Sequence, residues 1–391
     1  MRDAYIVSSV RTPGCRRAKG AFKDTRPEDL LAFILNAALK QTPNLDPQII
    51  DDVMVGCAFP EAEQGLNIGR IVTQIAGLPI EVSGATVNRF CASGIEAISL
   101  AALRVMAGWS EVAIGSGVES MTYVPMGGNI ARPHPEHCKT HADLYVSMGI
   151  TAENVAKRYK ISRQEQDEFA LWSHQKAAEA TAKKLFTEIV PTPAFKYVTE
   201  NGTYKKESFL MSHDDGIRAE TTIEGLAKLR PVFAAGGSVT AGNSSQTTDG
   251  AAVTILMSGD KVKELGLKPV AKLKCYTTVG CRPDEMGVGP KYAIPKLLKI
   301  AGLNIKDIGL FELNEAFASQ ALYCAKELGI EMSKINIHGG AIALGHPLGC
   351  TGAKLCATLI ANMRERGVKY GVESMCIGGG MGAAALIELC D

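Results

Sequence analysis

Several polar clusters along the chain hold residue types that act as nucleophiles, bases or hydrogen-bond donors. Cys91 follows a short apolar run and precedes the long apolar segment 92–108, which places it at the start of a buried helix. Unpaired N–H groups at a helix start favour a thiolate over a thiol, so we expect a lowered pKa for Cys91. The alternative is that Cys91 is one more small buried hydrophobic residue.

A thiol nucleophile needs a base, and three further clusters hold candidates for the remaining roles. His346 lies in the glycine-rich segment 339–354, where the alternative is a His-Pro pair that stiffens a loop. Cys376 precedes three glycines, whose N–H groups are suited to an oxyanion hole, or it is a small residue in a crowded turn. Asn314 either donates to a substrate or holds a water, or it caps a helix.

Other kinds of site fit the sequence less well. One segment has the spacing of a metal-ligand cluster, but Pro133 and Pro135 interrupt it, and we predict no metal at His134, His137, Cys138 and His141. The segment GSGVES lacks the third glycine of a dinucleotide fingerprint, and GCTGAK lacks the spacing of a P-loop. No basic stripe indicates nucleic-acid binding.

Composition is that of an ordinary soluble globular protein. The 391 residues are 46% apolar and 21% charged, and the net charge of +1 provides no bulk attraction to nucleic acid or anionic membranes. Eleven cysteines without a CxxC pair indicate reduced thiols, and strand-like sequence from Ala4 leaves no room for a secretory leader. No run of about 18 apolar residues predicts a membrane span. We expect a cytoplasmic protein.

Strand and helix patterns alternate in the first and last thirds of the chain, which predicts an α/β fold. The expected strands are 4–10, 53–58, 112–120, 251–258, 270–280, 310–315 and 335–340, with two more in 370–389. The expected helices are 27–40, 67–76, 92–108, 162–184, 292–302, 316–329 and 352–366. Each chemical cluster follows a predicted strand, and strand ends are where open α/β sheets bind ligands.

The last third repeats the order of elements found in the first. Strand, polar turn, buried helix and strand occur in 85–120 and again in 335–374, and both segments end in GVES. We therefore predict two similar α/β halves. The first half comprises 1–120 and 244–268, the second comprises 269–391, and the polar, proline-rich segment 121–243 is an inserted loop domain over the core.

These clusters, taken in order, resemble the thiolase family. The resemblance rests on VNRFCASG, GNSSQTTDGAA (242–252), NEAF, GGAIALGHPLGCTGA and CIGGGMG, and it runs over nearly the whole chain. It implies a five-layer α-β-α-β-α core of two βαβαβαββ halves, with the loop domain covering a coenzyme A site. It also implies thiolytic cleavage of 3-ketoacyl-CoA, or the reverse Claisen condensation.

The resemblance assigns a role to each cluster. Cys91 is the acylated nucleophile, His346 activates it, and Cys376 is the acid and base for the acetyl-CoA carbon and the CoA thiol. Asn314 holds a water that forms one oxyanion hole with His346, and the N–H groups of Cys91 and Gly378 form the other. No cofactor is implied, because coenzyme A is a substrate. The implied coenzyme A contacts are Arg218, Ser245, Met148 and Phe317.

The resemblance also implies a subtype and possible partners. VNRFCASG and DDGIRAETT are closer to degradative 3-ketoacyl-CoA thiolases of fatty-acid β-oxidation than to biosynthetic acetoacetyl-CoA thiolases, in which a histidine is usual at the position of Ser147. The alternatives are that biosynthetic type, a decarboxylating ketoacyl synthase, and a non-catalytic lipid- or CoA-binding relative. The family implies a homodimer or homotetramer, and some members bind a multifunctional β-oxidation enzyme.

Overall fold

Two apolar α/β segments form the core of the protein, whose computed structural model describes residues 2–200 and 202–390. The elements of the first segment are β1 (Ala4–Arg11), β2 (Cys15–Arg16), α1 (Pro27–Lys40), β3 (Asp52–Gly56), α2 (Ile68–Ile75), β4 (Ser83–Val87), α3 (Ser93–Met106), β5 (Val112–Ser120), β8 (Thr248–Ser258) and α8 (Gly259–Glu264). Those of the second are β9 (Ala271–Gly280), α9 (Gly289–Ala301), β10 (Leu310–Leu313), α10 (Ala318–Leu328), α11 (Ala341–Leu344), α12 (Thr351–Arg366), β11 (Tyr370–Ile377) and β12 (Met381–Leu389).

The strands of both segments join in one mixed sheet with the order β10-β11-β12-β9-β1-β8-β5-β3-β4 in the described part of the chain. The order is symmetric about β1 and β9. On each side of this central pair, the next two strand pairings are antiparallel, and the strands further out pair in parallel. In the described residues, the two half-sheets are joined by two residue pairs between β1 and β9, Tyr5 with Lys272 and Ile6 with Ala271. This arrangement confirms the predicted α/β fold of two similar halves.

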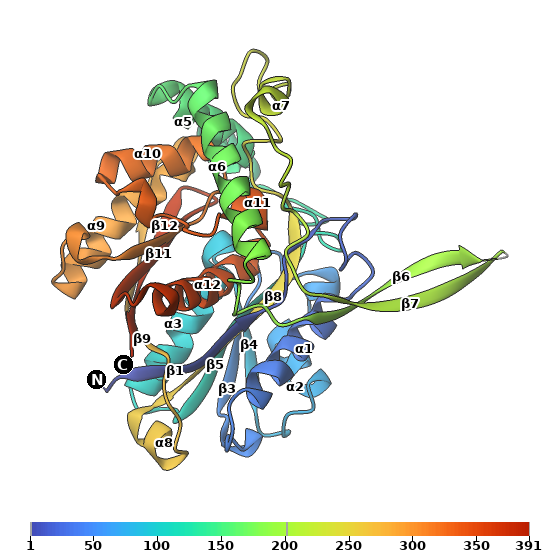
Figure 1. Ribbon diagram of the computed structural model, residues 1–391, viewed down its shortest axis with the longest axis vertical. Coiled ribbons are helices and arrows are strands. Elements are labelled where there is room, and N and C mark those ends of the chain that lie inside the picture. The colour runs from blue at the N-terminus through green and yellow to red at the C-terminus, as the bar shows by residue number, and fades with distance from the viewer. Residues whose placement is uncertain (1, 201, 391) are drawn as a thin grey trace.

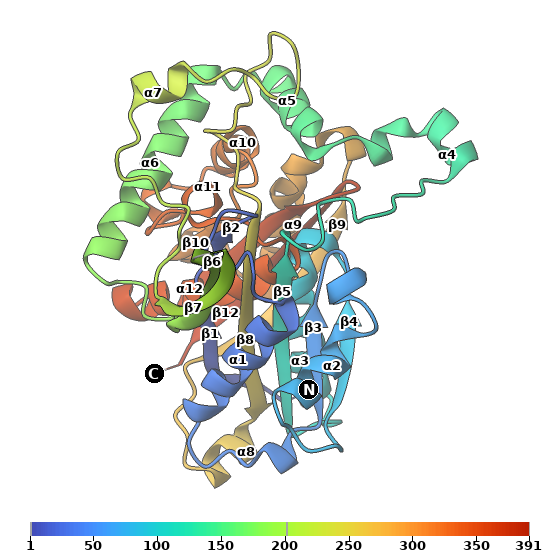
Figure 2. The same cartoon turned by 90° about the vertical axis from the view of Figure 1, so that its right-hand side faces the viewer.

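Helices cover both faces of each half-sheet and make the five layers (Figure 1). The central layer is α3 and α12, whose apolar residues pack together with the inner faces of both half-sheets. Helices α1 and α2 cover the outer face of the first half (Figure 2), and α9 and α10 cover that of the second. Because α3 is surrounded on all sides, it is apolar nearly all round.

The predicted strand at 335–340 is wrong. Only Ile335 forms a bridge, to Phe311 of β10, and the chain then turns. Asn336 takes a positive φ of 43°, and its side-chain amide bonds to both the N–H and the C=O of Leu313 at 2.8 and 2.9 Å. The side chain thus takes the place of a backbone ladder, which ends the pairing after one residue.

The repeated GVES tetrapeptide does not mark equivalent positions in the two halves. Gly117 pairs with Gly56 at the last pair of β3 and β5, whereas Gly371 pairs with Leu310 at the first pair of β10 and β11. The four-letter match is therefore out of register. The order of the strands, and not this tetrapeptide, carries the internal symmetry.

The segment between β5 and β8 lies over the core and holds α4 (Pro135–Thr140), α5 (Met148–Arg158), α6 (Arg163–Ala182), β6 (Thr192–Glu200), β7 (Thr203–Met211) and α7 (Ile223–Ala227). A capping box of Ser162 and Glu165 opens α6, close to the start of the predicted helix 162–184. Strands β6 and β7 form a hairpin that projects from the body (Figure 1). The exact domain boundaries stay predictions.

In the described residues, no helix combines the length and the hydropathy that a membrane crossing requires.

We expect Gly94→Ala to destabilise the protein by about 1–3 kcal/mol, because overpacking a close helix contact forces backbone shifts. A Cβ at Gly94 of α3 would lie 2.5 Å from the backbone nitrogen of Ala353 in α12. Denaturant unfolding measures the change in free energy. Gly280→Ala is the matched control, because a Cβ there meets nothing within 4 Å. Equal stability of both variants would contradict a close packing of α3 on α12.

Candidate active site

The structure places four predicted residues where strands end or central helices begin. Cys91 lies in a short 3-10 turn between β4 and α3, and Asn314 directly follows β10. His346 lies between α11 and α12, and Cys376 is near the end of β11 before the glycine turn. All four are at least 93% buried, since Cys91, the most exposed, is 7% accessible. These residues come from both halves, as strand-end geometry predicts.

The imidazole of His346 is held from both of its nitrogens. Its Nδ1 lies 2.5 Å from the hydroxyl of Thr351, and its Nε2 lies 3.4 Å from the amide nitrogen of Asn314. Thr351 donates its own proton to the carbonyl of Pro347 at 3.0 Å, so it accepts from His346. The proton of the neutral ring is therefore on Nδ1, and Nε2 is left as the base.

Burial keeps His346 uncharged. Desolvation, reinforced by the nearby charge of Lys354, lowers the pKa of His346 to about 3. The ring is neutral throughout the physiological range and can accept a proton at Nε2. A neutral imidazole is the protonation state that can act as a general base.

The expectation of a lowered pKa for Cys91 is wrong. Burial raises the pKa of the Cys91 thiol to about 12, although the N–H groups of Gly378 and of Cys91 itself oppose this rise. The carboxylate of Glu119 raises the pKa further. Desolvation of a buried thiolate outweighs the helix-start effect. The resting pair is thus a neutral thiol and a neutral imidazole, and the two N–H groups are available when charge develops.

Cys376 is a second buried thiol beside the first. Burial raises the pKa of Cys376 well above the ordinary value, and the proximity of Cys91 raises it further. A thiolate on one sulfur therefore opposes ionisation of the other. A neutral thiol in this position is a proton donor, which suits the acid and base role predicted for it.

Two of the predicted coenzyme A contacts pack at this centre. Met148 and Phe317 belong to one apolar cluster with Cys376. The backbone N–H of Ser245 donates to the carbonyl of Ala316 at 2.9 Å, and Ala316 is two residues beyond Asn314 in the sequence. Arg218 is exposed, and its backbone N–H donates to Nδ1 of His174 in α6 at 3.2 Å. Burial lowers the pKa of His174, and the charge of Arg218 lowers it further.

Sequence reasoning missed two positioning residues. Thr351 fixes the tautomer of His346, and the sequence feature that could have identified it is a hydroxyl directly before the predicted helix 352–366. Glu119 accepts backbone N–H groups from Ala58 at 2.8 Å in one half and from Gly349 at 2.7 Å in the other. The sequence feature that could have identified Glu119 is a carboxylate at the end of an otherwise uncharged strand. Glu119 thus ties the loop after β3 to the loop that carries His346.

The Oδ1 atom of Asn314 is buried and has no hydrogen-bond partner among the described residues. A buried carbonyl oxygen without a partner is costly, so this acceptor suits a site that receives a polar group. Together, the site offers a thiol, a base, a second thiol and several N–H donors. This set suits covalent acyl transfer with stabilisation of an oxyanion.

Comparisons with known proteins agree with this chemistry. The family models for the N-terminal and C-terminal domains of thiolase match residues 4–260 and 267–389. The chain is 50% identical to the 3-ketoacyl-CoA thiolase of Bacillus subtilis (strain 168) over 100% of both proteins. It is 48% identical to the peroxisomal 3-ketoacyl-CoA thiolase B of Rattus norvegicus, over 99% of this chain and 91% of that protein.

Solved structures give the same result. The acetyl-CoA acetyltransferase of Bacillus anthracis superposes with a TM-score of 0.90 and 37% identity, over 100% of this chain and 99% of that one. The dimeric peroxisomal thiolase of Saccharomyces cerevisiae superposes with a TM-score of 0.89 and 39% identity, over 100% and 98%.

We expect Thr351→Val to lower kcat by about 10–100-fold, because the partner that fixes a functional imidazole is lost. Thr351→Ser keeps the hydroxyl and is expected to retain most of the activity. Steady-state kinetics should show the loss in kcat with little change in KM. A Thr351→Val enzyme that folds normally and keeps its kcat would contradict this role.

We also expect the alkylation of Cys91 by iodoacetamide to accelerate about tenfold per pH unit between pH 7 and 9, because a thiol with a pKa near 12 gains thiolate in that proportion. The rate is read from peptide mass spectrometry at Cys91. The Cys376→Ser variant serves as the control for the neighbouring thiol. A plateau near pH 8 would show a lowered pKa instead.

Proposed function

This chain belongs to the thiolase family and is an acyltransferase, and from that premise we propose that it cleaves 3-ketoacyl-CoA with coenzyme A in fatty-acid β-oxidation. The observation that carries the proposal is the buried constellation of a thiol, a base with an unprotonated Nε2 and a second thiol. The 3-ketoacyl-CoA thiolases among the relatives, at 47–50% identity, support the degradative subtype. The position before Met148 is Ser147, where biosynthetic members usually have a histidine.

The first half-reaction forms an acyl-enzyme. The sulfur of Cys91 attacks the C3 carbonyl of the substrate while Nε2 of His346 takes the thiol proton. The bond between C2 and C3 then breaks, the acyl group stays on Cys91, and the electron pair leaves as the enolate of acetyl-CoA. The enolate carbon takes a proton from Cys376, which gives acetyl-CoA and a Cys376 thiolate.

The second half-reaction transfers the acyl group. Cys376 takes the proton of an incoming CoA thiol, whose sulfur attacks the thioester on Cys91. The shortened acyl-CoA leaves, and Cys91 regains its proton from His346. Every proton taken in the first half-reaction is thereby returned in the second.

Two sets of donors stabilise the developing negative charge. The N–H groups of Cys91 and Gly378 lie at the Cys91 sulfur, so we assign them to the oxyanion that forms on the attached acyl group. Asn314, through a water, and His346 are assigned to the enolate oxygen. Coenzyme A binding is proposed for Arg218, Ser245, Met148 and Phe317. No cofactor enters this scheme.

A homodimer is the proposed minimal assembly, with a homotetramer as its extension. Strand β4 is the free edge of the first half-sheet, and such an edge is a template for pairing with another strand. Beside it, Leu66 is 92% exposed and Phe90, next to Cys91, is 37% exposed. A related thiolase of yeast is described as dimeric. A multifunctional β-oxidation enzyme is a further proposed partner.

The cytoplasm is the proposed location. The ten cysteines from Cys15 to Cys376 are free thiols. Reduced thiols are typical of proteins in a reducing compartment.

We expect the enzyme to cleave 3-ketoacyl-CoA substrates of four to sixteen carbons, including those longer than four carbons. Thiolysis is followed by the loss of the 3-ketoacyl-CoA absorbance at each chain length. Cys91→Ala is the inactive control, because it lacks the nucleophile. Activity on the four-carbon substrate alone would indicate the biosynthetic type, and carbon dioxide release from a malonyl thioester would indicate a ketoacyl synthase.

A further inference from the structure

Residues 214–218, which we call the anchor loop, end in Arg218, a proposed coenzyme A contact. Arg218 is exposed, so its position depends on the backbone that carries it. A guanidinium is suited to phosphate groups such as those of coenzyme A. Because ordering a loop on binding costs free energy, the affinity for coenzyme A should depend on how firmly the anchor loop is fixed beforehand.

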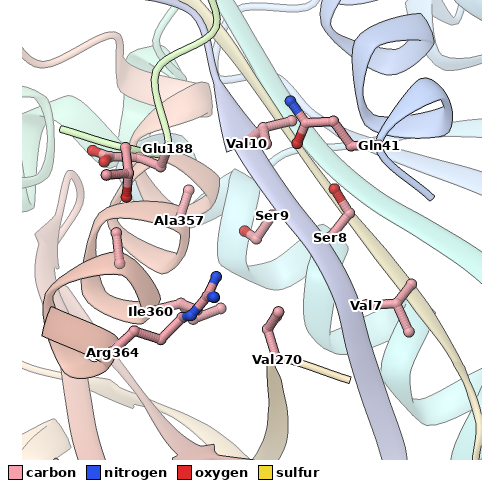
Figure 3. Close-up of a pocket in the computed structure, with 12 residues that line it drawn as sticks. Val7, Ser8, Ser9, Val10, Gln41, Glu188, Val270, Ala357, Ile360 and Arg364 are labelled. Atoms are coloured by element: carbon pink, nitrogen blue, oxygen red, sulfur yellow. The ribbon is translucent and has the colours of Figure 1, made fainter. Parts of the chain in front are cut away.

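The first residue of the anchor loop is fixed by a buried ion pair. Asp214 accepts from Nη1 and Nη2 of Arg11 at 2.7 and 3.0 Å, and from the N–H of Gly14 at 2.6 Å. Arg11 also donates from Nε to Glu188 at 3.0 Å. Glu188 lines a cavity of about 230 Å³ between β1 and α12 (Figure 3). This end of the anchor loop is therefore tied to the core.

The middle of the anchor loop is tied to the segment that carries the proposed base. Nε2 of Gln246 donates to the carbonyl of Gly216 at 2.8 Å, and the backbone carbonyl of Gln246 accepts from the N–H of His346 at 3.1 Å. Gly216 packs closely there, because a Cβ would lie 2.4 Å from the side-chain amide of Gln246. Gln246 thus sets the distance between the anchor loop and the proposed catalytic centre.

The last residue of the anchor loop is held by a buried histidine. The N–H of Arg218 donates to Nδ1 of His174 in α6 at 3.2 Å, and His174 is 3% exposed. Because Nδ1 accepts, the proton of the neutral ring is on Nε2. Burial, and then the charge of Arg218, lower the pKa of His174 to about 4 against the charge of Glu220. The acceptor is therefore available at neutral pH.

The preceding residue of α6 reaches the proposed catalytic centre. The hydroxyl of Ser173 donates to Glu315 at 2.7 Å and accepts from the N–H of Gly340 at 3.0 Å. Glu315 directly follows Asn314 in the sequence. Two successive residues of α6 therefore hold the proposed catalytic centre and the anchor loop, so this helix sets the spacing between them.

We propose that His174 is a positioning residue for coenzyme A, because it fixes the backbone of Arg218 at a set distance from the catalytic centre. His174 acts through Arg218 and does not touch the reacting atoms. The inference rests on the proposed function, in which Arg218 contacts coenzyme A. It makes His174 a determinant of specificity for thiols that carry the nucleotide phosphates, and shorter thiols should not depend on it.

Thiolysis kinetics with coenzyme A as the varied substrate test this role. We expect His174→Leu to raise the KM for coenzyme A about fivefold with little change in kcat, because a hydrogen bond that fixes Arg218 is lost. His174→Gln keeps a side-chain acceptor and should restore the KM of the unaltered enzyme. His213→Leu, which removes an exposed histidine beside the anchor loop, is the matched control and should leave both constants unchanged.

Two further comparisons show whether His174 acts through Arg218. The double variant of His174→Leu and Arg218→Ala should have the same KM for coenzyme A as Arg218→Ala alone, because the histidine has no other route to the ligand. With N-acetylcysteamine as the acyl acceptor, which lacks the nucleotide, His174→Leu and the unaltered enzyme should have equal KM values. His174→Phe also lacks the acceptor but keeps an aromatic ring, and it should behave like His174→Leu. Melting temperatures check that each variant is folded.

Three results would overturn the proposal. One is a KM for coenzyme A that stays unchanged in both His174→Leu and His174→Phe. Another is an additive effect of the two changes in the double variant, and the third is an equal loss with N-acetylcysteamine. Failure of the proposed function would look different, because thiolysis by the unaltered enzyme would be absent. Titration calorimetry with coenzyme A would then still compare the same variants without turnover.

Discussion

The close contact of α3 with α12 is the constraint on which the active site depends. Gly94 and Gly352 let the two helices approach until backbone meets backbone, since a Cβ on either would lie 2.5 Å or less from a backbone nitrogen of the other helix. Cys91 lies directly before α3, and His346 lies just before α12. The proposed nucleophile of one half and the proposed base of the other are therefore positioned by the same packing. Larger residues at this contact would separate the two catalytic loops as well as the helices.

Burial of that junction determines the chemistry. Desolvation raises the pKa of Cys91 to about 12 and lowers the pKa of His346 to about 3, so both groups are neutral at rest. In the proposed mechanism, charge arises only when the thiol proton moves to Nε2. The N–H groups of Cys91 and Gly378, and the amide of Asn314, are already in place for it. Fixed dipoles in a water-poor site stabilise such transient charge without reorganisation.

The fold class and the four chemical clusters could be predicted from the sequence, because apolar periodicity and glycine-flanked polar residues are local signals. The direction of the pKa shift at Cys91 could not be predicted, because the sequence indicates a buried helix start but does not show that desolvation of the thiolate outweighs the helix-start N–H groups. The strand expected at 335–340 failed for a related reason. Its apolar pattern is real, but the side chain of Asn336 replaces the ladder. Thr351 and Glu119 were missed because their partners lie in contacts that only the folded chain makes.

The two halves share a topology but differ at the ends of corresponding strands. The last ladder pairs are Gly56 with Gly117 in one half and Leu313 with Ser374 in the other, and two residues further along lie Glu119 and Cys376. Glu119 accepts N–H groups from both halves and ties their loops together. A carboxylate at the position of Cys376 would repel a thiolate on Cys91. A thiol there stays neutral and can give up a proton. One strand end therefore ties the loops of the site together, and the other supplies the proton of the proposed mechanism, so that mechanism depends on the asymmetry of the halves.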